Sequence, residues 1–133
     1  MPNLQNLVLT DRATTPVNHT FTPSDSGNGV GVVVETTGVP TGESRFSISN
    51  RRVGEKIKGK AVLTIPVVQN EIVNGISRPV VVRTAIISMD VTFAKDSTEQ
   101  ERNDAVGMFA SSLQTTKVLV HDTFVKAQGV FTS

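Results

Sequence analysis

The stretch "RFSISNRRVGEKIKGKAVLTIP", residues 45–66, carries a clear strand pattern. Polar and apolar residues alternate from Arg45 to Arg51, and they alternate again from Lys58 to Ile65. A period of two is the signature of a β-strand that has one wet face and one buried face. Gly54 lies between the two halves and predicts a turn. The stretch therefore predicts a β-hairpin with one polar face.

The same stretch is strongly cationic. Residues 45–60 hold six of the thirteen Lys and Arg residues of the chain and one acid, Glu55, which gives a local charge of +5. The net charge of the whole 133-residue chain is only +1. A concentrated patch of this kind indicates a polyanionic partner. It is equally typical of a solvated face whose Lys side chains keep strand edges from pairing, so charge alone leaves both interpretations open.

The segment before this hairpin also predicts strands. Leu4–Thr10 and Pro16–Thr22 predict an N-terminal hairpin, and "SDSGNG" at 24–29 predicts a loop by its composition. Val30–Thr37 is rich in β-branched residues and predicts a strand, which the turn residues of "GVPTGE" at 38–43 should end.

Two further strands are expected after the cationic hairpin. Pro66 lacks an N–H and predicts a sheet edge or the end of its strand. Asn74-Gly75, within a loop expected over residues 69–79, is a strong hairpin signal. Val80–Phe93 alternates again and predicts a long strand.

The pattern becomes helical near the C-terminus. Residues 97–114 begin with two overlapping capping boxes, Ser97 with Gln100 and Thr98 with Glu101. Apolar residues then recur at helical spacing, and residues 117–127 predict a second, shorter helix.

The expected fold class is therefore α+β: an antiparallel β-sheet meander with an N-terminal hairpin, followed by two C-terminal α-helices. We expect a single domain over residues 1–133, with the sheet in 1–93 and the helices in 97–127. The helices should cover the apolar face of the sheet, which carries Phe46, Ile48, Leu63, Ile65, Ile87 and Met89.

Composition argues against several classes of protein. The chain has no Cys, which excludes a disulfide framework, a thiolate metal site and a Cys nucleophile. His19 and His121 are the only histidines, and neither has a second ligand at metal-binding spacing. No Ser/His/Asp set is recognisable. We therefore expect no enzyme activity, no cofactor, no metal and no small-molecule substrate.

No feature of the sequence suggests a membrane or an export signal. The start, "MPNLQNLVLTD", lacks the basic segment and the long apolar segment of a signal peptide. No stretch approaches the ~18 apolar residues of a membrane helix. The sequence predicts a protein that is made in the cytoplasm and has no membrane partner.

The order and spacing of several motifs resemble a known family. These motifs are "FSISNR" with the cationic hairpin and "LTIPVVQ", then "VNGISRPVVVR", "MDVTF" with "STEQER", and the closing "GVF". Together they resemble the coat proteins of the single-stranded RNA bacteriophages, the leviviruses, over nearly the whole chain.

The resemblance implies an assembly and a function. Two subunits would form an intertwined two-fold dimer with a continuous ten-stranded sheet, and the dimers would build a T=3 icosahedral shell around the genomic RNA. The open sheet face would also bind an RNA hairpin and repress translation of the replicase. Subunits would be made in the bacterial host cytoplasm and end in the virion. The loop at 69–79, with a cis or trans Arg78-Pro79 bond, would adapt the subunit to different positions in the shell.

Eleven residues are candidates for RNA binding. The basic residues among them that suit phosphate contacts are Arg45, Arg51, Lys56 and Lys58. The short polar residues that can form hydrogen bonds with the edges of RNA nucleobases are Ser47, Ser49, Thr64 and Ser88. The resemblance implies that Val30, Ser47, Ser49 and Lys60 line pockets for unstacked bases. Ile86 stands where the family often has a stacking Tyr, and Val62 stands where it commonly has a Lys.

Two other functions remain as alternatives to a capsid subunit. One is a dimeric RNA-binding regulator that does not form a shell, and the other is an enzyme of unrecognised type. Electron microscopy of the purified protein separates the first alternative from a capsid protein, because only the capsid protein forms shells.

Overall fold

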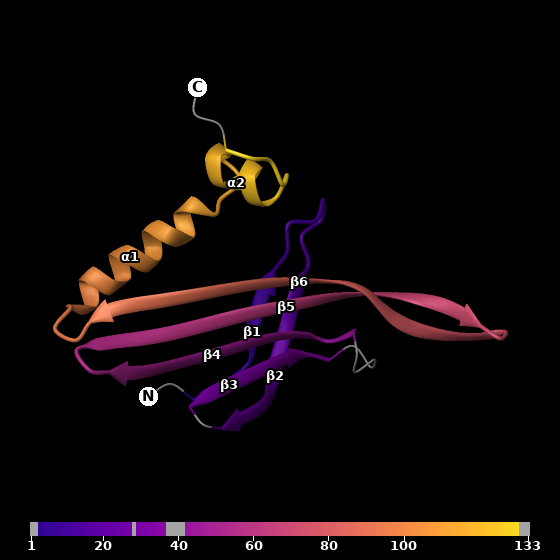
Figure 1. The fold of residues 1–133 in the computed structure, drawn as a ribbon, viewed down its shortest axis with the longest axis horizontal. Coiled ribbons are helices and arrows are strands. Elements are labelled where there is room, and N and C mark those ends of the chain that lie inside the picture. The colour runs from indigo at the N-terminus through magenta and orange to yellow at the C-terminus, as the bar shows by residue number, and fades with distance from the viewer. Residues whose placement is uncertain (1–2, 28, 37–41, 131–133) are drawn as a thin grey trace. The chain divides into compact units, whose positions relative to one another are not determined.

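The computed structural model describes residues 3–27, 29–36 and 42–130. Its elements are β1 (Leu7–Thr10), β2 (Asn18–Gly27), β3 (Val30–Glu35), β4 (Ser44–Val53), β5 (Lys56–Val73), β6 (Ile76–Ala94), α1 (Glu99–Ser112) and α2 (Val118–Phe124). The strands form one six-stranded sheet in the order β1-β2-β3-β4-β5-β6 (Figure 1). Each strand thus neighbours the next one along the chain, and the predicted meander followed by two helices is confirmed.

The chain divides into two compact units, residues 1–92 and 93–133. The first contains nearly all of the sheet, and the second contains α1 and α2. Each unit is described by itself.

The β4–β5 hairpin forms as the alternating sequence predicts. Gly54 has a φ of 59°, a left-handed conformation that glycine adopts without strain, and it turns the chain between Val53 and Lys56. Phe46 pairs with Leu63, and Ser47 pairs with Val62. This register places Phe46, Ile48 and Leu63 on one face, and Arg45, Ser47, Ser49, Lys60 and Thr64 on the other together with Val62.

The β5–β6 hairpin is longer than the sequence predicts. Asn74 and Gly75 both have positive φ, 53° and 77°, as a two-residue type I′ turn requires. The hairpin signal is therefore confirmed, but the loop expected at 69–79 is wrong, because strand structure reaches the turn from both sides. Figure 1 shows this hairpin extending beyond the end of β4.

Pro66 does not end its strand, so of the two predicted possibilities the strand end is wrong and the sheet edge is confirmed. The β4–β5 pairing stops at Arg45 and Thr64, and Pro66 lies beyond it. The N–H that Pro66 lacks therefore breaks no bond to β4, and β5 continues beside β6 alone. The described residues contain no cis peptide bond, so Arg78-Pro79 is trans.

The loop predicted at 24–29 is mostly strand. β2 continues to Gly27, which pairs with Val30. The pairing register with β3 shifts between Pro23 and Asp25, as at a β-bulge. Gly29, with a φ of 77°, belongs to the tight turn that follows. Backbone pairing with β3 therefore overrides the turn-rich composition. Thr37 and most of the predicted break at 38–43 lie outside the described residues.

Side chains from other segments reach the sheet at two glycines. A Cβ on Gly31 would lie 2.9 Å from Cδ1 of Leu4, and a Cβ on Gly59 would lie 2.7 Å from Cγ2 of Val91. Both distances are shorter than a normal contact, so Leu4 or Val91 would have to shift if the facing glycine carried a side chain. In the described residues the buried apolar side chains are those of Phe21, Val33 and Val34.

The helical unit begins with a side-chain cap. Oγ1 of Thr98 accepts a hydrogen bond of 3.2 Å from the backbone N–H of Glu101. Ser97 is not the cap; its hydroxyl donates to the carbonyl of Ala94 at 2.7 Å. Of the two predicted capping boxes, the structure thus uses Thr98.

The helices are shorter than predicted and carry exposed apolar side chains. The exposed positions in α1, α2 and the residues that follow α1 include Val106, Phe109, Leu113, Leu119 and Phe124. Their coverage of the apolar sheet face stays a prediction.

Candidate nucleic-acid interface

The register of β4 and β5 brings the predicted RNA-binding residues together. Residues directly opposite one another in an antiparallel pair point to the same face. Arg45 pairs with Thr64, Ser47 with Val62, Ser49 with Lys60, Arg51 with Lys58, and Val53 with Lys56. We call the side of the sheet that carries these residues the cationic face.

Strand β3 adds aliphatic side chains to this face. Val30 pairs with Ser49, which in turn pairs with Lys60, so these three side chains form a row across three strands. Val32 and Val34 continue the same face opposite Ser47 and Arg45. The cationic face is therefore polar over β4 and β5 and apolar over β3.

Strand β6 contributes the last two candidates. Gly59 pairs with Asn50 and so belongs to the opposite face, and Val91 is the side chain that approaches its Cβ position. Alternation along β6 then places Ile86 and Ser88 on the cationic face. Both are exposed, Ile86 to 66%. All eleven candidate residues thus lie on one face of four adjacent strands.

The Lys and Arg side chains of this face are exposed and make no ion pair within the described part of the chain. They are Arg45, Arg51, Lys56, Lys58 and Lys60. Arg52, by contrast, pairs with Ile57 and belongs to the opposite face. Five unneutralised cations on one exposed surface form a site that suits a polyanion.

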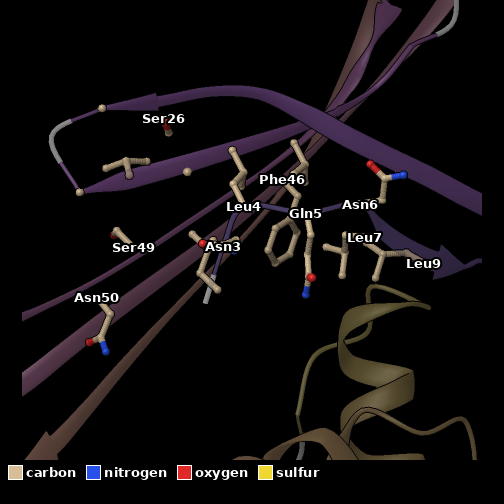
Figure 2. Close-up of a pocket in the computed structure, with 16 residues that line it drawn as sticks. Asn3, Leu4, Gln5, Asn6, Leu7, Leu9, Ser26, Phe46, Ser49 and Asn50 are labelled. Carbon is tan, nitrogen blue, oxygen red and sulfur yellow. The ribbon is translucent and has the colours of Figure 1, made fainter. Parts of the chain in front are cut away.

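An apolar groove of about 1000 Å³ lies mainly on the opposite face, and its lining also includes Val30 and Ser49 of the cationic face. It is lined by the segment 3–9 and by residues of β2, β3 and β4, and Figure 2 shows the side chains of Leu4, Leu7 and Phe46 around it. None of its lining residues has an ionisable side chain. The groove lining therefore offers no acid or base that could transfer a proton or activate its serine hydroxyls.

One polar cluster was missed by the sequence analysis. Nε2 of His19 lies 2.7 Å from Oδ2 of Asp11, and Nδ1 lies 2.6 Å from Oε2 of Glu35. The hydrogen bond with His19, followed by those from the backbone N–H groups of Val17 and Ala13, lowers the pKa of Asp11 to about 2. The bonds with Asp11 and Glu35 raise the pKa of His19. Spacing gives no signal for this cluster, because only the strand pairing brings the three residues together.

Other kinds of site are absent from the part of the chain that the structure describes. It contains no group of three or more His, Asp or Glu side chains arranged to hold a metal ion. Among the same residues, no helix has both the length and the apolar character needed to cross a membrane.

Comparisons with known proteins agree with one another. The family model described as "Levivirus coat protein" matches residues 2–131. The capsid protein of Pseudomonas phage PRR1 is 53% identical over 129 residues, which cover 96% of this chain and 98% of that protein.

Solved structures share the fold. The capsid protein of bacteriophage GA has a TM-score of 0.83 at 23% identity, covering 97% of this chain and 98% of its own. An unassembled bacteriophage coat protein dimer, described as an RNA-binding dimer, has a TM-score of 0.67 at 20% identity and covers 98% of both chains. The six-stranded sheet with two C-terminal helices is thus the fold of levivirus coat proteins. The chain belongs to the levivirus coat protein family, a family of structural capsid proteins and not of enzymes.

Proposed function

We propose that this coat protein forms two-fold dimers, that the dimers assemble into a T=3 icosahedral shell, and that the cationic face binds the RNA genome inside it. The observation that carries the RNA-binding part is the arrangement of five exposed Lys and Arg side chains, none of them in an ion pair within the described residues, on one face of β4 and β5. The family membership carries the capsid part.

The dimer is supported by what the single chain leaves unsatisfied. Among the described strands, β6 is the last of the sheet, is 19 residues long and neighbours only β5. Such an edge promotes association unless it is paired or covered. Pairing β6 with β6 of a second copy would give an isologous contact and the ten-stranded sheet of an intertwined dimer.

Exposed apolar side chains in both units support the same proposal. Ile48 and Ile87 are 54% and 63% exposed, and Leu119 and Phe124 are 70% and 71% exposed. Apolar surface of this extent on a small chain marks an interaction surface. Only three apolar side chains are buried among the described residues, which is a small core. A second copy of the chain that covers the exposed apolar surface would enlarge it.

Binding to RNA would be largely electrostatic. Cations on a protein surface displace the counterions of the phosphates, so affinity falls as salt rises. If all five Lys and Arg side chains of the cationic face contact phosphates, the slope of log affinity against log salt concentration should be about −3.5 for single-stranded RNA. Since these Lys and Arg side chains make no ion pair within the described residues, no such pair has to break before they bind phosphate.

We extend the proposal to a translational operator. The row Val30, Ser49 and Lys60 combines an apolar patch, a hydroxyl and an ammonium group, which together can accept an unstacked base and its phosphate. Ile86 supplies apolar contact but no aromatic stacking. Binding an RNA hairpin at the replicase start through this row would repress translation in the host cytoplasm.

Microscopy combined with nuclease treatment tests the proposal. The purified protein should appear as uniform shells that contain RNA resistant to nuclease. Dimers that bind RNA without forming shells would instead support the alternative function, a dimeric regulator. A protein that forms neither shells nor RNA complexes would contradict both functions.

A further inference from the structure

His19 lies between two carboxylates that come from different parts of the chain. It sits in β2, opposite Leu9 of β1. Asp11 follows β1, and Glu35 is the last residue of β3. The His19 and Asp11 side chains are each 37% exposed and that of Glu35 is 22% exposed, so all three are partly shielded from water. We call these three residues the His19 clasp.

The two contacts of the clasp require a proton. An ionised carboxylate only accepts hydrogen bonds, and a neutral imidazole has a single N–H to donate. His19 is within hydrogen-bond distance of a carboxylate oxygen at each ring nitrogen, 2.7 Å at Nε2 and 2.6 Å at Nδ1. Both bonds therefore form together only when the ring is the doubly protonated imidazolium.

The clasp also organises the connection between β1 and β2. Oδ1 of Asp11 accepts hydrogen bonds from the backbone N–H groups of Ala13 and Val17, at 3.1 and 3.0 Å. The other oxygen of the same carboxylate faces His19. One side chain thus joins the connection at 11–17 to β2, and His19 joins both to the end of β3.

We propose that the His19 clasp is a proton-dependent lock that holds the N-terminal β1–β2 hairpin to β3, closed when His19 is charged and released when it is neutral. Loss of the proton leaves one nitrogen lone pair facing a carboxylate, which turns an attraction into a repulsion. The inference is independent of RNA binding and of shell formation.

The direction of the pH effect follows from the groups that face His19. The hydrogen bond to Asp11, then that to Glu35, raises the pKa of His19 above its ordinary value of 6.5. These two acids are the charged groups that act on the ring, and Arg12 is the next charged residue along the chain. The clasp is therefore fully stabilising below pH 6.5 and loses its effect as pH rises through the folded pKa of His19.

The acid limit is set by Asp11. The pKa of its carboxyl falls from 3.8 to about 2, chiefly through the bond with His19, so its contribution is present above pH 3.8 and disappears as pH falls through about 2. Between these limits the lock is closed.

The variant Glu35→Gln tests the mechanism. Its amide can donate to Nδ1 of a neutral His19 while Nε2–H donates to Asp11, so the variant keeps both contacts without the extra proton. The measurement is hydrogen exchange of peptides from residues 7–27 in the full-length protein between pH 6 and pH 9. Exchange of β4 peptides serves as the internal reference, since it corrects for the intrinsic pH dependence of exchange.

In the unmodified chain we expect the protection of residues 7–27 to fall relative to β4 as pH rises. Glu35→Gln should remove most of that fall, His19→Gln should lower protection already at pH 6, and His121→Gln, which leaves the clasp intact, should behave like the parent. Constant relative protection in the parent chain would overturn the proposal. A fall in Glu35→Gln equal to that of the parent would do the same.

Discussion

Arg51 on β4 lies directly opposite Lys58 on β5, and both side chains leave the sheet on the cationic face. Like charges in directly opposite positions destabilise a β-hairpin. Neither base has an acidic partner among the described residues. The protein therefore maintains a repulsion that a polyanion would relieve, and this is the pattern expected of a binding surface.

This repulsion predicts the effect of removing one charge. Lys58→Gln should raise the free energy of unfolding at low salt, by less than about 1 kcal/mol, and should weaken RNA binding. The gain should shrink as salt screens the two charges. Denaturant unfolding at two salt concentrations measures it. Arg52→Gln, opposite Ile57, is the matched control and should show no such gain.

The contact between Gly59 and Val91 predicts a second effect. Gly59→Ala would place a methyl group 2.7 Å from Cγ2 of Val91 and should destabilise the sheet by roughly 1–3 kcal/mol. Val91→Ala should relieve the clash, so the double variant should be more stable than the sum of the single effects predicts. Unfolding of the four proteins at equal concentration provides the test, and strict additivity would show that the two residues do not touch.

The cap of α1 predicts a third effect. Thr98→Ala removes the acceptor for the N–H of Glu101 and should cost about 1 kcal/mol. Thr98→Ser keeps a hydroxyl at the same place and should retain most of the stability. Equal losses in both variants, measured by thermal unfolding, would show that the methyl group of Thr98 matters and the hydrogen bond does not.

The open edge of β6 predicts the smallest stable species. Because few apolar side chains are buried within one chain, the folded protein should not persist as a monomer. Native mass spectrometry of protein released from shells under mild conditions should give dimers as the smallest folded species. A folded monomer that remains stable on dilution would contradict the proposed edge pairing.

Local chemistry made much of this fold predictable from the sequence. The alternation at 45–51 and 58–65 predicted that Phe46 and Leu63 share a face, and the strand pairing confirms it, since a slip of one residue would separate them. Asn74-Gly75 predicted the turn because both positions need positive φ. Thr98 predicted the start of α1 to within a residue.

The errors arose where pairing overrides composition. Residues 24–27 have the composition of a loop, yet they form strand because β3 offers them backbone partners. Pro66, where a strand end was one of two possibilities, stays within β5 because it lies at a sheet edge, beyond the last pair with β4. The His19 clasp could not be predicted at all, since its residues are 8 and 16 positions apart and meet only through the sheet.

Adjacent arginines give the most direct test of the central claim, that RNA binds the cationic face. Arg51 belongs to that face and Arg52 to the opposite one, and both are exposed. Arg51→Gln and Arg52→Gln change the net charge equally. A difference between their affinities for a single-stranded RNA, measured across salt concentrations, therefore reports only the face on which the charge was removed. Only Arg51→Gln should weaken binding and make the salt slope shallower by about 0.7. Equal effects of the two variants, or a larger effect of Arg52→Gln, would contradict it.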